Sequence, residues 1–266
     1  MGENMYEYRL KVITNELEAA LKLLNIDIVE EEIYSEKEYI LYSDNKLSDM
    51  LQSMNIDFIE SSVDTLGWQD KWKEYLKPGL LTENVKYIFD EKDKIDGKKS
   101  IFINPSLAFG TGNHPTTKIA AMFLEELAYG NNVLDVGCGS GILSILASIT
   151  GSVAVYGFDV DKIALSNTAE NIALNNRDNI YVWAGGIESI KQNILFDVVC
   201  ANIISSVLLS IKDELFNHAG KYLVVSGILT DEKDNFLEKF WNNKFNVVKQ
   251  KEIDNWFGAV FKREKF

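Results

Sequence analysis

The stretch VLDVGCGSG, from Val133 to Gly141, decides the fold class of this 266-residue chain. Its first four residues form a short apolar run rich in β-branched side chains, which is typical of a buried parallel strand. The glycines predict a tight turn, and the apolar segment 142–149 (ILSILASI) predicts a helix packed on a sheet. Strand, glycine turn and helix make half of a nucleotide-binding βαβ unit, because glycines let the backbone approach a ligand closely.

The spacing of these glycines indicates the ligand. A dinucleotide site has G-x-G-x-x-G and places a pyrophosphate on the helix N-terminus. Here Gly137, Gly139 and Gly141 form G-x-G-x-G, and Asp135 precedes them. A carboxylate there suits a cationic ligand better than a pyrophosphate. D-x-G-x-G-x-G is the pattern of methyltransferases that use S-adenosylmethionine, which carries an ammonium and a sulfonium and no phosphate. A dinucleotide site and a turn that binds nothing remain the alternatives.

Two polar residues follow predicted strands of the same sheet. Asp159 lies near the end of the second strand, in VAVYGFDVD, where an acid suits a ribose diol. Asn202 follows the strand FDVVC, and ligands bind outside the carboxyl ends of such strands. We expect Asn202 to exchange hydrogen bonds with the reacting centre and to align it; an ordinary strand-end turn is the alternative.

A second candidate region precedes the glycine turn. Pro115, Thr116 and Thr117 open a predicted amphipathic helix, whose free N-terminus can bind a carboxylate. For Thr117 we weigh cofactor contact against a role limited to starting the helix. His114, a lone histidine in the preceding loop, is either structural or catalytic.

The composition limits the partners. The net charge of −13 argues against tight nonspecific binding of nucleic acid and fits a basic protein substrate, although many proteins are simply acidic. The two cysteines, Cys138 and Cys200, form no disulfide framework and no zinc set, so we expect free thiols and no metal. With no signal-peptide layout and no apolar stretch of membrane-spanning length, we expect a cytoplasmic protein that acts away from membranes. We also expect a monomer.

The chain divides into three predicted parts. Residues 1–62 predict a small α+β ferredoxin-like domain for substrate recognition, with strands and helices in the order βαββαβ (6–13, 15–24, 26–33, 38–42, 46–54 and 56–60). Residues 63–78 predict a linker helix. Its Trp68 and Trp72 share one face, either packed on the next domain or exposed to substrate.

Residues 79–266 predict the catalytic domain. Its early part predicts a hairpin of strands 86–90 and 100–103, and later segments predict single helices at 207–216 and 231–240. The alternation of strands and helices ends in an antiparallel pair, 245–250 and 256–262. This layout is α/β, a Rossmann-like seven-stranded class I methyltransferase domain.

Four stretches taken together, SLAFGTGNHPTT, VLDVGCGSGILSI, GFDVDKIAL and DVVCANII, resemble the ribosomal protein L11 methyltransferase family, called PrmA in bacteria. The resemblance implies a ferredoxin-like domain that captures the ribosomal protein, a linker and a Rossmann-like catalytic domain. It implies methylation of lysine side chains and of an N-terminal α-amine. Thr117, Gly137, Asp159 and Asn202 match the family's cofactor-binding positions.

This chain departs from the family at a few positions. The family usually has Asp-Pro-Gly, Thr and Asn-Ile-Leu-Ala where this chain has Asn104-Pro105-Ser106, Asn113 and Asn202-Ile203-Ile204-Ser205. These departures leave the substrate more open than the chemistry. Another basic protein, or a nucleic-acid amine, is the alternative substrate, although no aromatic follows Asn202 to stack a flipped base. A cofactor-binding module without catalysis is the alternative of another class.

Overall fold

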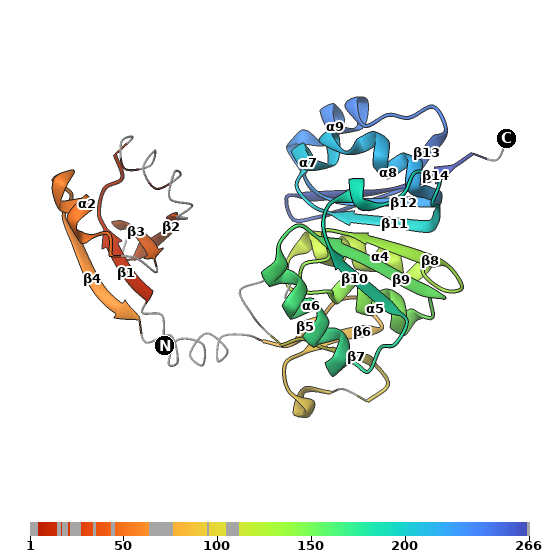
Figure 1. Ribbon diagram of the computed structural model, residues 1–266, viewed down its shortest axis with the longest axis horizontal. Helices are drawn as coiled ribbons and strands as arrows, with labels where there is room; N and C mark the ends of the chain where they lie inside the picture. Colours follow the sequence, from red (N-terminus) through yellow and green to blue (C-terminus); the bar gives the residue numbers. More distant parts are fainter. Residues whose placement is uncertain are drawn as a thin grey trace. The chain divides into compact units, whose positions relative to one another are not determined.

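The computed structural model describes residues 5–14, 17, 21, 28–33, 36–43, 46–63, 77–94, 96–104 and 112–264. The chain forms two compact units, Met1–Leu76 and Lys77–Phe266 (Figure 1). Nearly all of the predicted linker helix, with Trp68 and Trp72, lies outside the described residues. Among the described residues, no helix has the length and apolar character needed to cross a membrane.

The first unit contains an antiparallel four-stranded sheet with the order β2-β3-β1-β4. Its strands are β1 (Met5–Leu10), β2 (Ile28–Ile33), β3 (Glu36–Ser43) and β4 (Phe58–Val63), with helix α2 (Ser48–Ser53) before the last strand. This is the strand order expected of a ferredoxin-like βαββαβ unit. Most of the predicted helix 15–24 lies outside the described residues, but Leu17 and Leu21 are buried against Tyr8 and Leu51.

The second unit is built on a seven-stranded mixed sheet with the order β10-β9-β8-β11-β12-β14-β13. The first five strands in this order are parallel, and β14 is antiparallel to both of its neighbours. This confirms the predicted α/β class I methyltransferase fold. The strands are β8 (Asn132–Val136), β9 (Ala154–Asp159), β10 (Ile180–Ala184), β11 (Phe196–Asn202), β12 (Ala219–Leu229), β13 (Phe245–Ile253) and β14 (Trp256–Arg263).

Helices cover both faces of this sheet (Figure 1). Alternate residues of β8 enter different cores: Val133 packs with α4 and α5, and Leu134 packs with α7, α8 and α9. The helices are α4 (Pro115–Leu127), α5 (Ile142–Thr150), α6 (Lys162–Leu174), α7 (Ser205–Ser210), α8 (Lys212–His218) and α9 (Lys233–Lys239), with 3-10 turns η2 (Ile187–Ser189) and η3 (Thr230–Glu232). Two helix predictions were wrong in detail. The predicted helix 207–216 breaks at Ile211 into α7 and α8, and 231–240 begins as η3.

A small sheet, β5-β6-β7, precedes the large one. It consists of β5 (Gly79–Leu80), β6 (Val85–Ile88) and β7 (Lys99–Phe102). The hairpin predicted from β6 and β7 was wrong, because the two strands pair in parallel, with Val85 opposite Lys99. A hairpin needs a short reversing turn. The connection 89–98 is longer and contains the 3-10 turn η1 (Glu91–Asp93), so it returns the chain to the start of β6.

Candidate functional site

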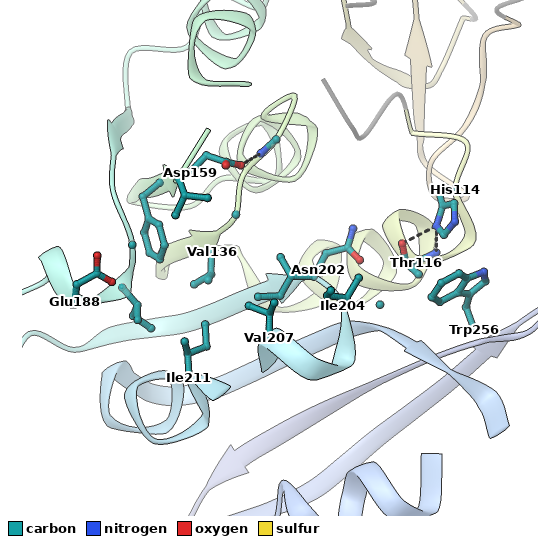
Figure 2. A pocket seen from close by; sticks show the side chains of 18 residues that line it. His114, Thr116, Val136, Asp159, Glu188, Asn202, Ile204, Val207, Ile211 and Trp256 are labelled. Carbon is teal, nitrogen blue, oxygen red and sulfur yellow. Dashed lines mark hydrogen bonds between the residues drawn. The ribbon is translucent and has the colours of Figure 1, made fainter. Parts of the chain in front are cut away.

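A cavity of about 620 Å³ opens at the carboxyl ends of β8, β9 and β11 (Figure 2). The chain runs from β8 to β9 and β10 on one side, and β11 lies on the other side of β8. Ligands of doubly wound sheets bind at this switch point. The cavity is lined by His114, Thr116, Val136, Gly137, Gly139, Phe158, Asp159, Val160, Gly186, Ile187, Glu188, Asn202, Ile203, Ile204, Val207, Ile211, Gly227 and Trp256.

The polar groups of the cavity are spread along it. Figure 2 shows the carboxylates of Asp159 and Glu188 at one end. His114 and Trp256 lie at the other end, and Asn202 lies between the two. Among the described lining residues there is no lysine or arginine. A ligand that fits this set presents hydrogen-bond donors or positive charge and carries no phosphate.

The glycine turn forms the floor of the cavity. Gly137, Gly139 and Gly141 all have positive φ, at 70°, 54° and 79°. A β-carbon on Gly137 would collide with Ile203, so the glycine allows the turn to lie against the end of β11. The N–H of Gly139 donates to Oδ2 of Asp159 across 2.9 Å, which ties the turn to the end of β9.

Asp159 lies where the sequence predicts, at the end of β9. Its Oδ1 accepts from the N–H of Asp161 across 2.9 Å, and each of its oxygens keeps a further lone pair for a ligand. The second carboxylate, Glu188, was not predicted. It lies so close over Gly186 that a β-carbon on this glycine would collide with it. Among the described residues, the Glu188 carboxylate has no hydrogen-bond or ion-pair partner.

Asn202 lines the middle of the cavity. Its Nδ2 donates to the hydroxyl of Thr117 across 3.4 Å. Its Oδ1 is buried and has no hydrogen-bond partner among the described residues. A buried amide oxygen without a partner costs free energy unless a ligand satisfies it. Thr117 itself is 1% exposed and does not line the cavity, whereas Thr116 does.

His114 caps helix α4. Its Nδ1 accepts from the N–H of Thr116 across 3.4 Å and lies 2.8 Å from the hydroxyl of the same residue. Because Nδ1 is an acceptor, the proton of the neutral ring is on Nε2. Burial lowers the pKa of His114, so the ring is neutral at pH 7. The ring also meets Trp256 edge to face, with centroids 4.9 Å apart. Helix capping and aromatic contact give His114 a structural role.

Asp135 lies beneath the turn, away from the ligand. The sequence suggested a ligand-facing carboxylate, but Asp135 is 1% exposed and its Oδ2 accepts from the hydroxyl of Ser144 on α5 across 2.6 Å. Burial raises its pKa to about 6, and the nearby charge of Asp159 adds to this rise. The reason for the difference is alternation along β8, which directs Val136 to the cavity and Asp135 to the helix face.

The cysteine prediction is confirmed, since Cys138 and Cys200 are both buried and free. Burial raises the pKa of both thiols, which keeps them protonated and unreactive. No group of three or more histidine, cysteine or acidic side chains suited to a metal occurs in the described part of the chain.

The family model and the curated relatives agree on one family. The family model described as "Ribosomal protein L11 methyltransferase (PrmA)" matches residues 7–264. A protein named ribosomal protein L11 methyltransferase from Streptococcus pyogenes serotype M49 is 37% identical over 203 residues. This match covers 74% of the present chain but 63% of the relative, so the chain spans less than two thirds of the length of such curated relatives.

Two solved structures carry the same fold. The crystal structure of a ribosomal protein L11 methylase from Lactobacillus delbrueckii subsp. bulgaricus superposes with a TM-score of 0.65 at 26% identity, covering 71% of this chain and 100% of that chain. A putative RNA methyltransferase from Pyrococcus horikoshii has a TM-score of 0.50 at 22% identity, covering 60% of this chain and 90% of that one. The second likeness shows the fold alone.

Proposed function

Because the chain belongs to the ribosomal protein L11 methyltransferase (PrmA) family, we propose that it transfers methyl groups from S-adenosylmethionine to amino groups of ribosomal protein L11. The proposed acceptors are lysine side chains and the N-terminal α-amine. The observation that carries this proposal is the cavity at the strand ends, with Asp159 and Glu188 at one end and the unpartnered oxygen of Asn202 in the middle.

The polar groups of the cavity suit this cofactor. The amino group of its base, the hydroxyls of its ribose and its ammonium are all donors, and Asp159, Glu188 and Asn202 offer acceptors. A dinucleotide, the alternative from the sequence, would bring a pyrophosphate into a cavity whose described lining holds no lysine or arginine. Acceptors without basic residues favour the cofactor that has no phosphate.

The strand order suggests which part of the cofactor each residue holds. β9 and β10 lie next to β8 on the side away from β11, so Asp159 and Glu188 are proposed to hold the nucleoside. In this arrangement Asp159 accepts from the ribose hydroxyls, and Glu188 accepts from the amino group of the base. Gly137 and Gly139 stay proposed contacts of the amino-acid part, and Thr117, which does not line the cavity, is proposed to act through its hydrogen bond to Asn202.

When bound, S-adenosylmethionine supplies a methyl group that its sulfonium already activates. The protein must then orient the substrate nitrogen and keep it neutral. Asn202 Oδ1 is proposed to accept one N–H of the amine, which directs the lone pair of the nitrogen. The apolar wall of Val136, Phe158 and Ile203 excludes water and disfavours the charged ammonium. Since Nδ1 of His114 is occupied by its own helix, we propose that no single general base is required.

The first unit is proposed to recognise the ribosomal protein. Residues 1–76 hold 17 acidic and 7 basic residues, so this part carries most of the net charge of −13. An acidic surface attracts a basic ribosomal protein and speeds their encounter. We propose residues 1–62 as the recognition domain, residues 63–78 as its link to the catalytic domain, and the cytoplasm as the place of the reaction.

Mass spectrometry of purified L11 after incubation with the protein and S-adenosylmethionine tests the proposal. We expect mass gains in steps of one methylene, lost with Asp159→Ala and kept with Asp178→Ala, which changes an exposed aspartate outside the cavity lining. If the mass of L11 does not increase although calorimetry shows cofactor binding, the proposed substrate is wrong. No cofactor binding at all would overturn the proposed chemistry.

A further inference from the structure

One face of helix α6 and its C-cap carries an asparagine at every fourth position: Asn167 and Asn171 lie in the helix, and Asn175 is the cap residue. This asparagine face pairs with the backbone of residues 102–104. The N–H of Phe102 donates to Asn175 Oδ1 (2.8 Å), and its carbonyl accepts from Asn175 Nδ2 (2.6 Å). The N–H of Asn104 donates to Asn171 Oδ1 (2.7 Å), and its carbonyl accepts from Asn167 Nδ2 (3.1 Å).

The same helix also holds the glycine turn. Asn171 Nδ2 donates to the carbonyl of Ser140 across 2.8 Å, and Thr168 Oγ1 donates to the carbonyl of Gly139. Asn171 and Thr168 are both fully buried. Since a peptide unit is planar and trans, fixing these two carbonyls also fixes the direction of the N–H groups that follow them. Helix α6 thereby sets the orientation of two successive peptide planes in the turn.

Asn171 differs from its neighbours on the asparagine face because its one amide group binds both the 102–104 backbone and the glycine turn. Its oxygen holds Asn104 and its nitrogen holds Ser140. Asn175 binds Phe102 and the carbonyl of Asn171 and makes no hydrogen bond to the glycine turn in the described structure. Both asparagines bind the 102–104 backbone, but Asn171 is the one that also binds the turn.

We propose that Asn171 is a positioning residue for the cofactor: by holding the carbonyl of Ser140, it keeps the glycine turn in the conformation that binds S-adenosylmethionine. This inference rests on the proposed function. Losing the amide leaves the buried carbonyl of Ser140 without that donor, so the turn relaxes toward other conformations and binding must restore the original one.

The matched pair Asn171→Ala and Asn175→Ala tests this proposal. Both variants lose backbone contacts to residues 102–104, so we expect both to lower the melting temperature, and Asn171→Ala to lower it more because its buried amide also binds Ser140. Calorimetry with S-adenosylhomocysteine, the cofactor product, should give a dissociation constant about 10-fold higher for Asn171→Ala and within about twofold of wild type for Asn175→Ala. In kinetics, Asn171→Ala should raise the KM for the cofactor and leave the KM for the protein substrate unchanged.

Thr168→Val provides a second variant that preserves side-chain shape. It removes the donor to Gly139, and we expect it to weaken cofactor binding several-fold with a small loss of stability. Equal changes in the dissociation constant of Asn171→Ala and Asn175→Ala would overturn the proposal. If Asn171→Ala does not fold, an unchanged dissociation constant in Thr168→Val would overturn it instead. Wild-type protein that fails to bind S-adenosylhomocysteine would instead overturn the proposed function.

Discussion

The amide of Asn202 donates to the hydroxyl of Thr117 across 3.4 Å, and its own oxygen is left buried without a partner among the described residues. Thr117 therefore supports the residue that is proposed to hold the substrate amine. We expect Asn202→Ala to lower kcat about 100-fold and Thr117→Val to lower it less than 10-fold, because the second change loosens the amide without removing it. Steady-state methylation kinetics measure both.

Asn202→Asp serves as the control, since it keeps an acceptor and lets the Thr117 hydroxyl donate to it. It should retain more activity than Asn202→Ala. A lower kcat for Thr117→Val than for Asn202→Ala would indicate that Thr117, and not Asn202, makes the direct contact with the substrate amine.

The Glu188 carboxylate over Gly186 predicts how the protein tells bases apart. A carboxylate accepts from an amino group but repels the oxygen of a 6-oxo purine. We expect wild-type protein to bind S-adenosylhomocysteine at least about 10-fold more tightly than S-inosylhomocysteine, and Glu188→Ala to lose most of this preference. Asp213→Ala, which removes a nearby carboxylate outside the cavity lining, should keep it. Unchanged discrimination in Glu188→Ala would remove Glu188 from base recognition.

Because the His114 ring is neutral, we expect no change in methylation activity above pH 7 that comes from its titration. Burial lowers the pKa of His114, so its charge does not change above pH 7. Activity should rise from pH 7 to pH 9 as the substrate amine, with a reference pKa of about 10.4, loses its proton. His114→Asn keeps a capping side chain and should keep this slope, with kcat within about 10-fold of wild type. A loss of several orders of magnitude with cofactor binding intact would make His114 a general base.

Gly227 allows β12 to pass close to Ile203. Its φ is +97°, it lies at the irregularity between Ser226 and Ile228, and a β-carbon there would collide with the carbonyl of Ile203. We expect Gly227→Ala to displace Ile203, the residue after Asn202, and to lower the free energy of unfolding by about 2–4 kcal/mol. Methylation activity should fall too. Gly130→Ala isolates the backbone contribution, because Gly130 has φ +68° and open space around it. Thermal denaturation should show a clearly smaller loss for Gly130→Ala.

Because the pKa of Asp135 is raised, we expect the free energy of unfolding to fall as the pH rises. Its pKa is raised by burial from 3.8 to about 6, so between these values the native state holds a proton that the unfolded state has lost. Stability therefore decreases across this window and stays lower above it, by about 3 kcal/mol for a shift of about two units. Asp135→Asn carries no charge, so the difference in melting temperature between variant and wild type should be more positive at pH 8 than at pH 4.

Ser148→Ala gives the matched control for this pH effect. Ser148 lies on the same helix as Ser144, but its hydroxyl donates to Asn179 across 2.5 Å. The difference between Ser148→Ala and wild type should therefore be the same at both pH values. A pH-independent effect of Asp135→Asn would show that Asp135 is not protonated in the native protein near pH 5.

Much of the lining of the candidate site can be predicted from the sequence, because strand ends are easy to locate. Gly137, Gly139, Asp159 and Asn202 come directly after apolar runs, and the carboxyl ends of parallel strands share one edge. Glu188 and Trp256 also line the cavity, but nothing in their sequence marks them. They depend on β10 lying beside β9, and on antiparallel β14 starting at that shared edge.

Two of the errors, the direction of β7 and the role of Asp135, have a common physical cause. The direction of β7 depends on the path of the connection between β6 and β7. A polar connection of this length is compatible with either an antiparallel or a parallel pair. The role of Asp135 depends on which face of β8 meets α5. Both are settled by tertiary packing, which local patterns of charge and hydropathy do not record.

The asparagine face of α6 also occupies backbone groups at the edge of the small sheet. β7 is the last strand of its small sheet, and such a strand offers free backbone groups to any passing chain. Phe102 and Asn104 are instead bonded by Asn167, Asn171 and Asn175. Asparagine side chains thus occupy backbone groups that could otherwise pair with a strand of another molecule, so the face that binds the glycine turn also leaves fewer free groups on this edge.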